Sequence, residues 1–186
     1  MSRSPVTPLA AAALIAAALL LAACDESERS GDVEVKTPKL ASDGRTLTMS
    51  EWRHAVSGIC REATEQIGHA STTLTKQLTS EPASLSEADI SRSAYEVSRP
   101  VIEDHLRQLA DLRPPPALDQ EYERYIQTLA LELELSGRIA MLVGEDGAEE
   151  ELLEADAGLA AAAEAANRFV HRRKLWGCAG GSVPEN

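Results

Sequence analysis

The stretch Thr48–Leu78, TMSEWRHAVSGICREATEQIGHASTTLTKQL, decides the fold. Its apolar residues recur every three or four positions, which places them on one face of an α-helix. These residues are Met49, Trp52, Val56, Ile59, Ala63, Ile67, Ala70, Leu74 and Leu78. Thr48 and Glu51 match a capping box, in which each side chain accepts a hydrogen bond from a free backbone N–H group. The pattern therefore predicts a long amphipathic helix that begins beside Thr48 and ends before Pro82.

Three further segments carry stripes with the same period. The second begins with a predicted Ser84–Glu87 capping box and comprises Ile90, Ala94, Val97, Val101, Leu106, Leu109 and Leu112. Pro100 lies inside it and predicts a kink, because proline removes one helical hydrogen bond. The third follows the corner 113–116 and comprises Leu118, Tyr122, Tyr125, Leu129, Leu133, Ala140 and Val143. The fourth begins with a predicted Asp146–Glu149 cap and comprises Leu152, Ala155, Leu159, Ala163, Ala166 and Phe169. We expect Gly177 to end it in a left-handed conformation.

Four amphipathic helices with short connections predict an all-α fold, an up-down-up-down four-helix bundle over residues 48–178. No segment shows the alternation of a β-strand, and residues 179–186 are expected to form a flexible tail. The chain has only six aromatic residues. A core of mostly Ala and Leu predicts close helix approach and disfavours a large internal ligand.

The first 23 residues have the features of a bacterial lipoprotein signal peptide. Arg3 precedes a run of 16 mostly apolar residues, 8–23, which is shorter than the ~20 residues needed to span a bilayer. Leu21-Ala22-Ala23-Cys24 resembles a lipobox: two small residues precede Cys24, whose thiol is the only group there able to accept a diacylglycerol group. We expect Cys24 to carry this lipid, the alternative being an ordinary signal peptide with an incidental cysteine.

Residues 24–47 are polar and without apolar periodicity, which is typical of a disordered tether. A flexible coil of this length has an end-to-end distance of roughly 25 Å. The bundle would therefore lie close to the cell membrane, anchored on its extracytoplasmic side by the acyl chains on Cys24. Apart from that lipid, the sequence predicts no cofactor.

Loss of the signal peptide leaves 17 Lys and Arg against 30 Asp and Glu, a net charge of −13. Such a surface repels phosphate backbones and disfavours nucleic-acid binding. The expected partners are the membrane and, where one exists, an envelope protein. The oligomeric state does not follow from these features.

Cys60 and Cys178 remain once Cys24 is lipidated, and an even pair in an oxidising compartment favours a disulfide. The alternative is two inert thiols. Such a bond would contribute roughly 5 kcal/mol in the chain-entropy model. An uninterrupted fourth helix up to residue 176 would rise about 42 Å, whereas Cys60 lies about 27 Å from the end of the first stripe. The sulfurs can therefore meet only if the fourth helix starts lower, ends early or is followed by a chain that folds back.

Several short motifs resemble a group of small secreted helical lipoproteins of actinobacteria. They are Ile59-Cys60-Arg61-Glu62-Ala63, Pro100, the corner Leu109-Ala110-Asp111-Leu112-Arg113-Pro114-Pro115, Tyr122, and Gly177-Cys178-Ala179-Gly180. The likeness covers nearly the whole mature chain. It implies a helical bundle closed by a Cys60–Cys178 bond outside the cell membrane, and it implies no activity.

No catalytic or metal-binding motif is present. None of the four histidines follows a glutamate by three residues, as di-iron bundles require, and no haem, zinc or phosphate-loop motif occurs. His105 lies near the second stripe and is interpreted as a boundary residue. Acidic residues crowd the start of the fourth helix without the spacing of a calcium loop. We interpret them as a solvated helix start.

Basic residues crowd the end of the fourth helix: Arg168, Arg172, Arg173 and Lys174. The helix dipole favours them there. In the predicted bundle this end lies at the pole joined to the tether, so we also consider that this basic patch faces anionic headgroups and orients the bundle.

Taken together, the sequence predicts a membrane-anchored lipoprotein with a non-catalytic binding or structural role in the cell envelope. Two alternatives stay open. The first is a carrier of a small ligand or metal, which would need a polar cluster on the inner helix faces. The second is an enzyme whose site is assembled from distant residues.

Overall fold

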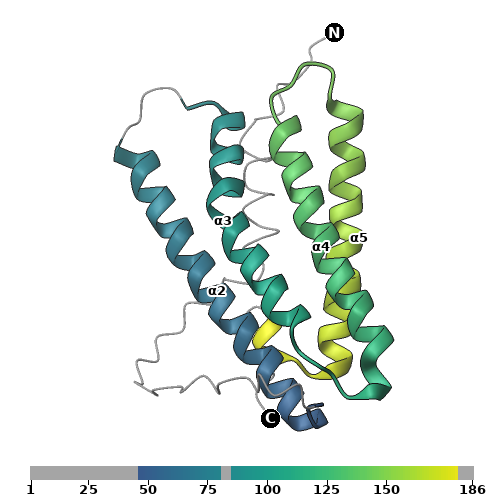
Figure 1. Cartoon of the computed structure of the whole chain (residues 1–186). Helices are drawn as coiled ribbons and strands as arrows, with labels where there is room; N and C mark the ends of the chain where they lie inside the picture. The colour runs from purple at the N-terminus through teal and green to yellow at the C-terminus, as the bar shows by residue number, and fades with distance from the viewer. Residues whose placement is uncertain (1–45, 81–84, 180–186) are drawn as a thin grey trace.

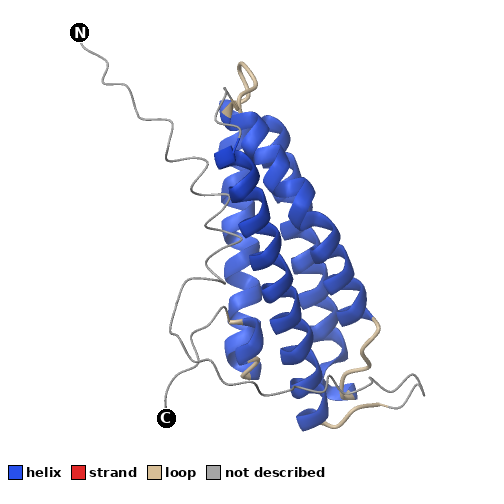
Figure 2. Cartoon of the chain, turned by 90° about the vertical axis from the view of Figure 1, so that its left-hand side faces the viewer, coloured by secondary structure: helices blue, strands red, loops and turns tan. Residues whose placement is uncertain are grey.

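The computed structural model describes residues 46–80 and 85–179, which form four α-helices (Figure 1). These are α2 (Met49–Ser80), α3 (Glu87–Ala110), α4 (Asp119–Leu142) and α5 (Glu149–Arg173), with short 3-10 turns at η1 (Pro116–Leu118) and η2 (Trp176–Cys178). Figure 2 shows no strand in this part of the chain. The predicted all-α helical bundle is thus confirmed. The predicted signal peptide, Cys24 and nearly all of the predicted tether lie outside the described residues.

Each helix packs mainly against the helix that precedes or follows it in the chain. Contacts are extensive between α2 and α3, α3 and α4, and α4 and α5, whereas α2 is joined to the end of the chain chiefly through η2. In Figure 1 the end of α2 near Ser80 lies well away from α5. The bundle is therefore closed at one pole by η2 and is less closed between α2 and α5 further along.

The starts of the first two helices have capping boxes. The predicted one is confirmed at α2, where the Thr48 hydroxyl accepts from Glu51 N–H at 3.3 Å and Glu51 Oε2 accepts from Thr48 N–H at 2.8 Å. At α3 the prediction is wrong by two residues. Ser86 is the N-cap and Asp89 completes the box, while Glu87 is the first helical residue. α3 then runs unbroken through Pro100, whose ring is exposed.

Both ends of α5 differ from the prediction. Asp146 does not cap the helix, because the chain turns through Gly144 and Gly147 with positive φ angles and Ala148 becomes an N-cap without a side-chain hydrogen bond. At the other end Lys174, at φ 57°, takes the left-handed position expected for Gly177. Gly177 serves a different purpose, since a Cβ atom there would lie 2.2 Å from the carbonyl oxygen of Ser57. It allows η2 to lie directly against α2.

The core consists of two clusters. The larger one joins the start of α2, the end of α3, the start of α4 and the end of α5. At its centre Trp52 is fully buried and makes edge contacts with Tyr122 and Phe169, with ring centroids 5.3 and 6.3 Å apart, while Tyr125 stacks on Phe169 at 4.4 Å. The smaller cluster joins the end of α4 to the start of α5. The pole of the bundle that η2 closes is thus filled by more aromatic side chains than the composition predicted.

Candidate functional site: a pocket between the two core clusters

A pocket of about 190 Å³, partly open to solvent, lies between the two core clusters. All four helices and η2 contribute to its lining. Its walls are mostly apolar and include Ile67, Ile102, Leu129, Leu133 and Leu159. The Ala- and Leu-rich sequence predicted close helix approach without such a space.

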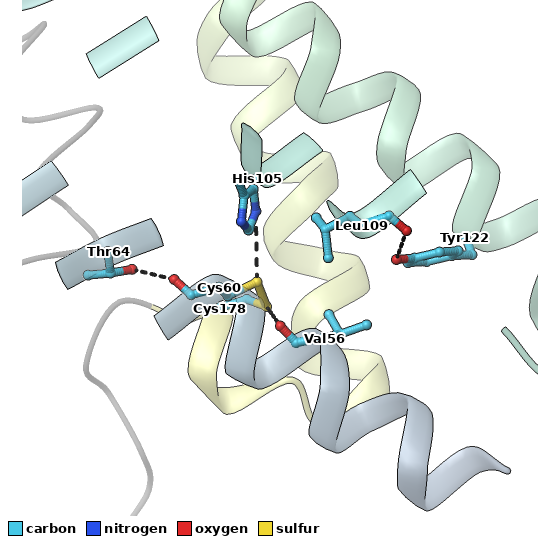
Figure 3. The surroundings of a disulfide bond; sticks show 7 residues. All are labelled: Val56, Cys60, Thr64, His105, Leu109, Tyr122 and Cys178. Carbon is cyan, nitrogen blue, oxygen red and sulfur yellow. Dashed lines mark hydrogen bonds between the residues drawn. A yellow bond between two sulfur atoms is a disulfide. The ribbon is translucent and has the colours of Figure 1, made fainter. Parts of the chain in front are cut away.

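The Cys60–Cys178 disulfide forms one end of the pocket, with a Cα–Cα distance of 4.9 Å. The bond is possible because α5 ends at Arg173 and the chain turns back through Lys174 into η2. Figure 3 shows the Cys178 sulfur close to α2, where it lies 3.8 Å from the Val56 carbonyl oxygen. The predicted pairing is confirmed. Two of the conditions that allow it are met, since the fourth helix ends early and the chain after it folds back.

His105 reaches from α3 towards this disulfide (Figure 3), with its Nε2 atom 4.0 Å from the Cys60 sulfur. Burial lowers the pKa of His105 below its usual value, although the Ile59 carbonyl and the Asp104 carboxylate act in the opposite direction. The ring is therefore neutral at pH 7. Its Nδ1 atom is buried without a hydrogen-bond partner. In the tautomer with the proton on Nε2, which faces the Cys60 sulfur, Nδ1 is an acceptor without a donor.

Glu132 lines the pocket from α4, the helix next to α3. Its Oε1 atom is buried and has no hydrogen-bond partner. Burial raises the pKa of Glu132 to about 7. Isolated carboxylates are costly to bury, and the group responds by holding its proton more tightly. Near neutral pH this carboxyl is thus balanced between its charged and uncharged forms.

The other polar groups of the pocket are already satisfied or inert. The Ser136 hydroxyl donates to the Glu132 carbonyl at 2.7 Å, and the Thr64 hydroxyl donates to the Cys60 carbonyl at 3.0 Å. Burial raises the pKa of the Tyr125 phenol above its usual range, so it stays protonated. His105 and Glu132 are the two pocket residues with a fully buried polar atom that lacks a hydrogen-bond partner.

The sequence interpretation missed Glu132. The third stripe was traced from Leu133 to Ala140, a step of seven residues, yet Glu132 and Ser136 continue the spacing of Tyr125 and Leu129 on the buried face. The signal that could have identified Glu132 is its place as a polar residue in the apolar stripe of this helix. His105, interpreted as a boundary residue, is half-buried in the structure, and its ring lines the pocket.

The basic patch lies at the end of α5, near the pole where η2 contacts α2. Arg172 and Arg173 both form ion pairs with Glu121 at the start of α4, and Arg168 pairs with Glu164. Lys174 is exposed. Two carboxylates thus offset part of the charge of these four residues.

The acidic start of α5 forms ordinary surface ion pairs, with Arg138 lying 3.6 Å from both Glu151 and Glu154. Within residues 46–80 and 85–179, no three His, Cys, Asp or Glu side chains are grouped closely enough to hold a metal ion. In the same part of the chain, no helix combines the length and apolar character needed to cross a bilayer.

Comparisons with protein-family models, with curated proteins and with solved structures gave no match to this chain. The resemblance to actinobacterial lipoproteins accordingly stays a prediction.

Proposed function

We propose that this protein is a membrane-anchored, extracytoplasmic lipoprotein whose helical bundle binds a small molecule in this pocket. The observation that carries the proposal is the pair of unpartnered polar atoms, His105 Nδ1 and Glu132 Oε1, on residues that line one mostly apolar space. Polar groups on inner helix faces are what a small-ligand carrier needs and a purely structural bundle does not.

The energetics of burial support a binding role over a structural one. A buried polar atom without a partner costs roughly 1–3 kcal/mol, and most native interiors avoid it. Protein cores are also packed to the density of organic crystals, with few spaces larger than a water molecule. A bundle that served only as a spacer would gain stability from an apolar residue in place of Glu132. Binding of a ligand with hydrogen-bonding groups would offset the cost.

The same groups support binding over catalysis. A buried histidine and a buried carboxyl are common acid–base residues. However, the Thr64 and Ser136 hydroxyls donate to backbone carbonyls, the Tyr125 phenol stays protonated, and both sulfurs of the pocket are in the disulfide. The pocket therefore offers no activated nucleophile among its lining residues, and we favour a non-catalytic role.

The proposed location depends on two features. The lipobox-like segment that ends at Cys24 is expected to direct export and acylation. The Cys60–Cys178 disulfide is a bond typical of oxidising compartments outside the cytoplasm. Together they support a position on the outer side of the cell membrane.

A probe of the right size tests whether the pocket binds small molecules at all. Benzyl alcohol combines an apolar body with one O–H donor for an unpaired acceptor. It would be added to residues 24–186 carrying Cys24→Ser, so that no detergent is needed, and binding would be followed by shifts of the Ile67 and Leu133 methyl signals in NMR spectra.

Two variants separate the pocket from the surface. Ala163 lines the pocket, so Ala163→Phe should fill it and abolish the shifts. Ala160 is exposed on the same helix, and Ala160→Phe should leave binding unchanged. Equal binding by both variants would show that the probe sits elsewhere and would contradict the proposal.

A further inference from the structure

The pocket presents hydrogen-bond acceptors and no cation. Among its lining residues, α4 contributes the Glu132 carboxyl and the Tyr125 phenol, and α3 contributes His105. The lining residues of α2 and α5 contain no acid or base, and no Lys or Arg lines the space. The ionised Glu132 therefore faces no protein counter-charge within the pocket, and the neutral His105 ring cannot supply one.

We propose that the pocket selects a small primary amine with an apolar body, whose ammonium group is held by the Glu132 carboxylate. This inference rests on the proposed function and specifies its ligand class. An ammonium group supplies the missing positive charge and three N–H donors, and charge-assisted hydrogen bonds are stronger than neutral ones. The His105 ring lines the same pocket and adds no competing positive charge.

The size and surroundings of the pocket agree with this class of ligand. An apolar cavity of about 150 Å³ accommodates benzene, so a space of about 190 Å³ has room for one ring or a short alkyl chain with an amino group. The strongly acidic chain also attracts cations to its surface. Anionic ligands would meet both this field and the Glu132 carboxylate.

The test compares two probes of nearly the same shape, benzylamine and benzyl alcohol, on residues 24–186 with Cys24→Ser under oxidising conditions. Their dissociation constants are measured by NMR titration at pH 8. We expect benzylamine to bind at least about tenfold more tightly than benzyl alcohol. Equal affinities for the two probes would overturn the proposed ligand class while leaving a binding pocket in place. Failure of both probes to bind would overturn the proposed function as well.

Protonation of Glu132 provides an independent check that needs no variant. Benzylamine remains protonated between pH 6 and 8, whereas a carboxyl with a pKa of about 7 loses most of its charge over that interval. The affinity for benzylamine should therefore fall about tenfold from pH 8 to pH 6, and that for benzyl alcohol should not. Parallel pH dependence of the two probes would contradict the role of Glu132.

Glu132→Gln removes the charge with little change in shape and should abolish the preference for the amine. Glu134→Gln is the matched control, since Glu134 is exposed on the same helix and its loss should leave the preference intact. A preference that persists in Glu132→Gln would place the amine elsewhere. Circular dichroism of both variants verifies the helical fold.

Discussion

At the scale of single residues, Glu132 links the stability of the bundle to pH. Its pKa rises from 4.5 to about 7 on folding, so the folded state binds this proton more tightly than the unfolded state. The stabilisation is fully present below pH 4.5 and is lost as the pH rises through 7. In Glu132→Gln this contribution is absent, so the free energy of unfolding of the wild type relative to the variant should fall by about 3 kcal/mol between pH 4.5 and 8.

Denaturant unfolding of the wild type and of Glu132→Gln across this pH range measures that difference directly. His105 contributes a pH dependence of the opposite sign in both proteins, so subtracting one free energy of unfolding from the other removes it. Glu134→Gln provides the control, because its free energy of unfolding should differ from that of the wild type by the same amount at every pH. A flat difference for Glu132→Gln would show that Glu132 is solvated in the folded protein and would remove the argument for a buried acid.

Residue-scale features were the hardest to predict from the sequence. The helix-capping pattern of Ser or Thr followed three positions later by an acid occurs at both Ser84–Glu87 and Ser86–Asp89, and only the structure decides between them. The left-handed residue after α5 is Lys174, not the nearby glycine. Spacing alone also cannot reveal that Glu132 and His105, on different helices, line one space.

At the scale of elements, η2 is held against α2 by close backbone approach as well as by the disulfide. Substitution of Gly177 by Ala would force its Cβ atom against the Ser57 carbonyl oxygen, and η2 would have to move. Gly177→Ala should therefore lower the free energy of unfolding by about 1–3 kcal/mol, the usual cost of overpacking.

Substitution of a second glycine, Gly58, provides a control in which the change in the free energy of unfolding should have the opposite sign. Gly58 follows Ser57 within α2, and a Cβ atom there meets nothing within 4 Å. Gly58→Ala should stabilise the protein by about 0.5–1 kcal/mol, because alanine favours the helix. Thermal and denaturant unfolding of both variants would test the pair, and equal effects of the two substitutions would contradict the described contact of η2 with α2.

The helices themselves were largely predictable, since apolar stripes with a period of three or four residues identified all four. Helix ends were less predictable because they depend on local hydrogen bonds and on turns such as that through Gly144 and Gly147. The sequence does not decide the path from Arg173 to Cys178. The early end of α5 depends on how η2 packs against α2, which is a tertiary contact that local spacing does not encode.

At the scale of the whole molecule, the basic patch lies at the pole where α2 begins, which is the end of the bundle nearest in sequence to the proposed anchor. We propose that it orients the bundle on anionic lipid, although Glu121 and Glu164 offset part of its charge. Neutralising Arg172, Arg173 and Lys174 to Gln should weaken binding to phosphatidylglycerol vesicles at low salt by about tenfold.

The measurement is a vesicle sedimentation assay with residues 24–186 carrying Cys24→Ser. A control with Arg61, Arg99 and Arg138 changed to Gln alters the net charge equally at exposed sites elsewhere. If both triple variants bind the vesicles equally, net charge alone governs the interaction and the patch has no orienting role.

The central claim, that the bundle carries a small molecule in its interior, is tested most directly by native mass spectrometry of the full oxidised chain exported by a bacterial host. We predict a mass 2 Da below the reduced polypeptide, plus any acyl groups, with one additional small molecule that is absent from Ala163→Phe and retained by Ala160→Phe. The bare oxidised mass for all three proteins would contradict the claim and would leave a structural role in the envelope as the better account.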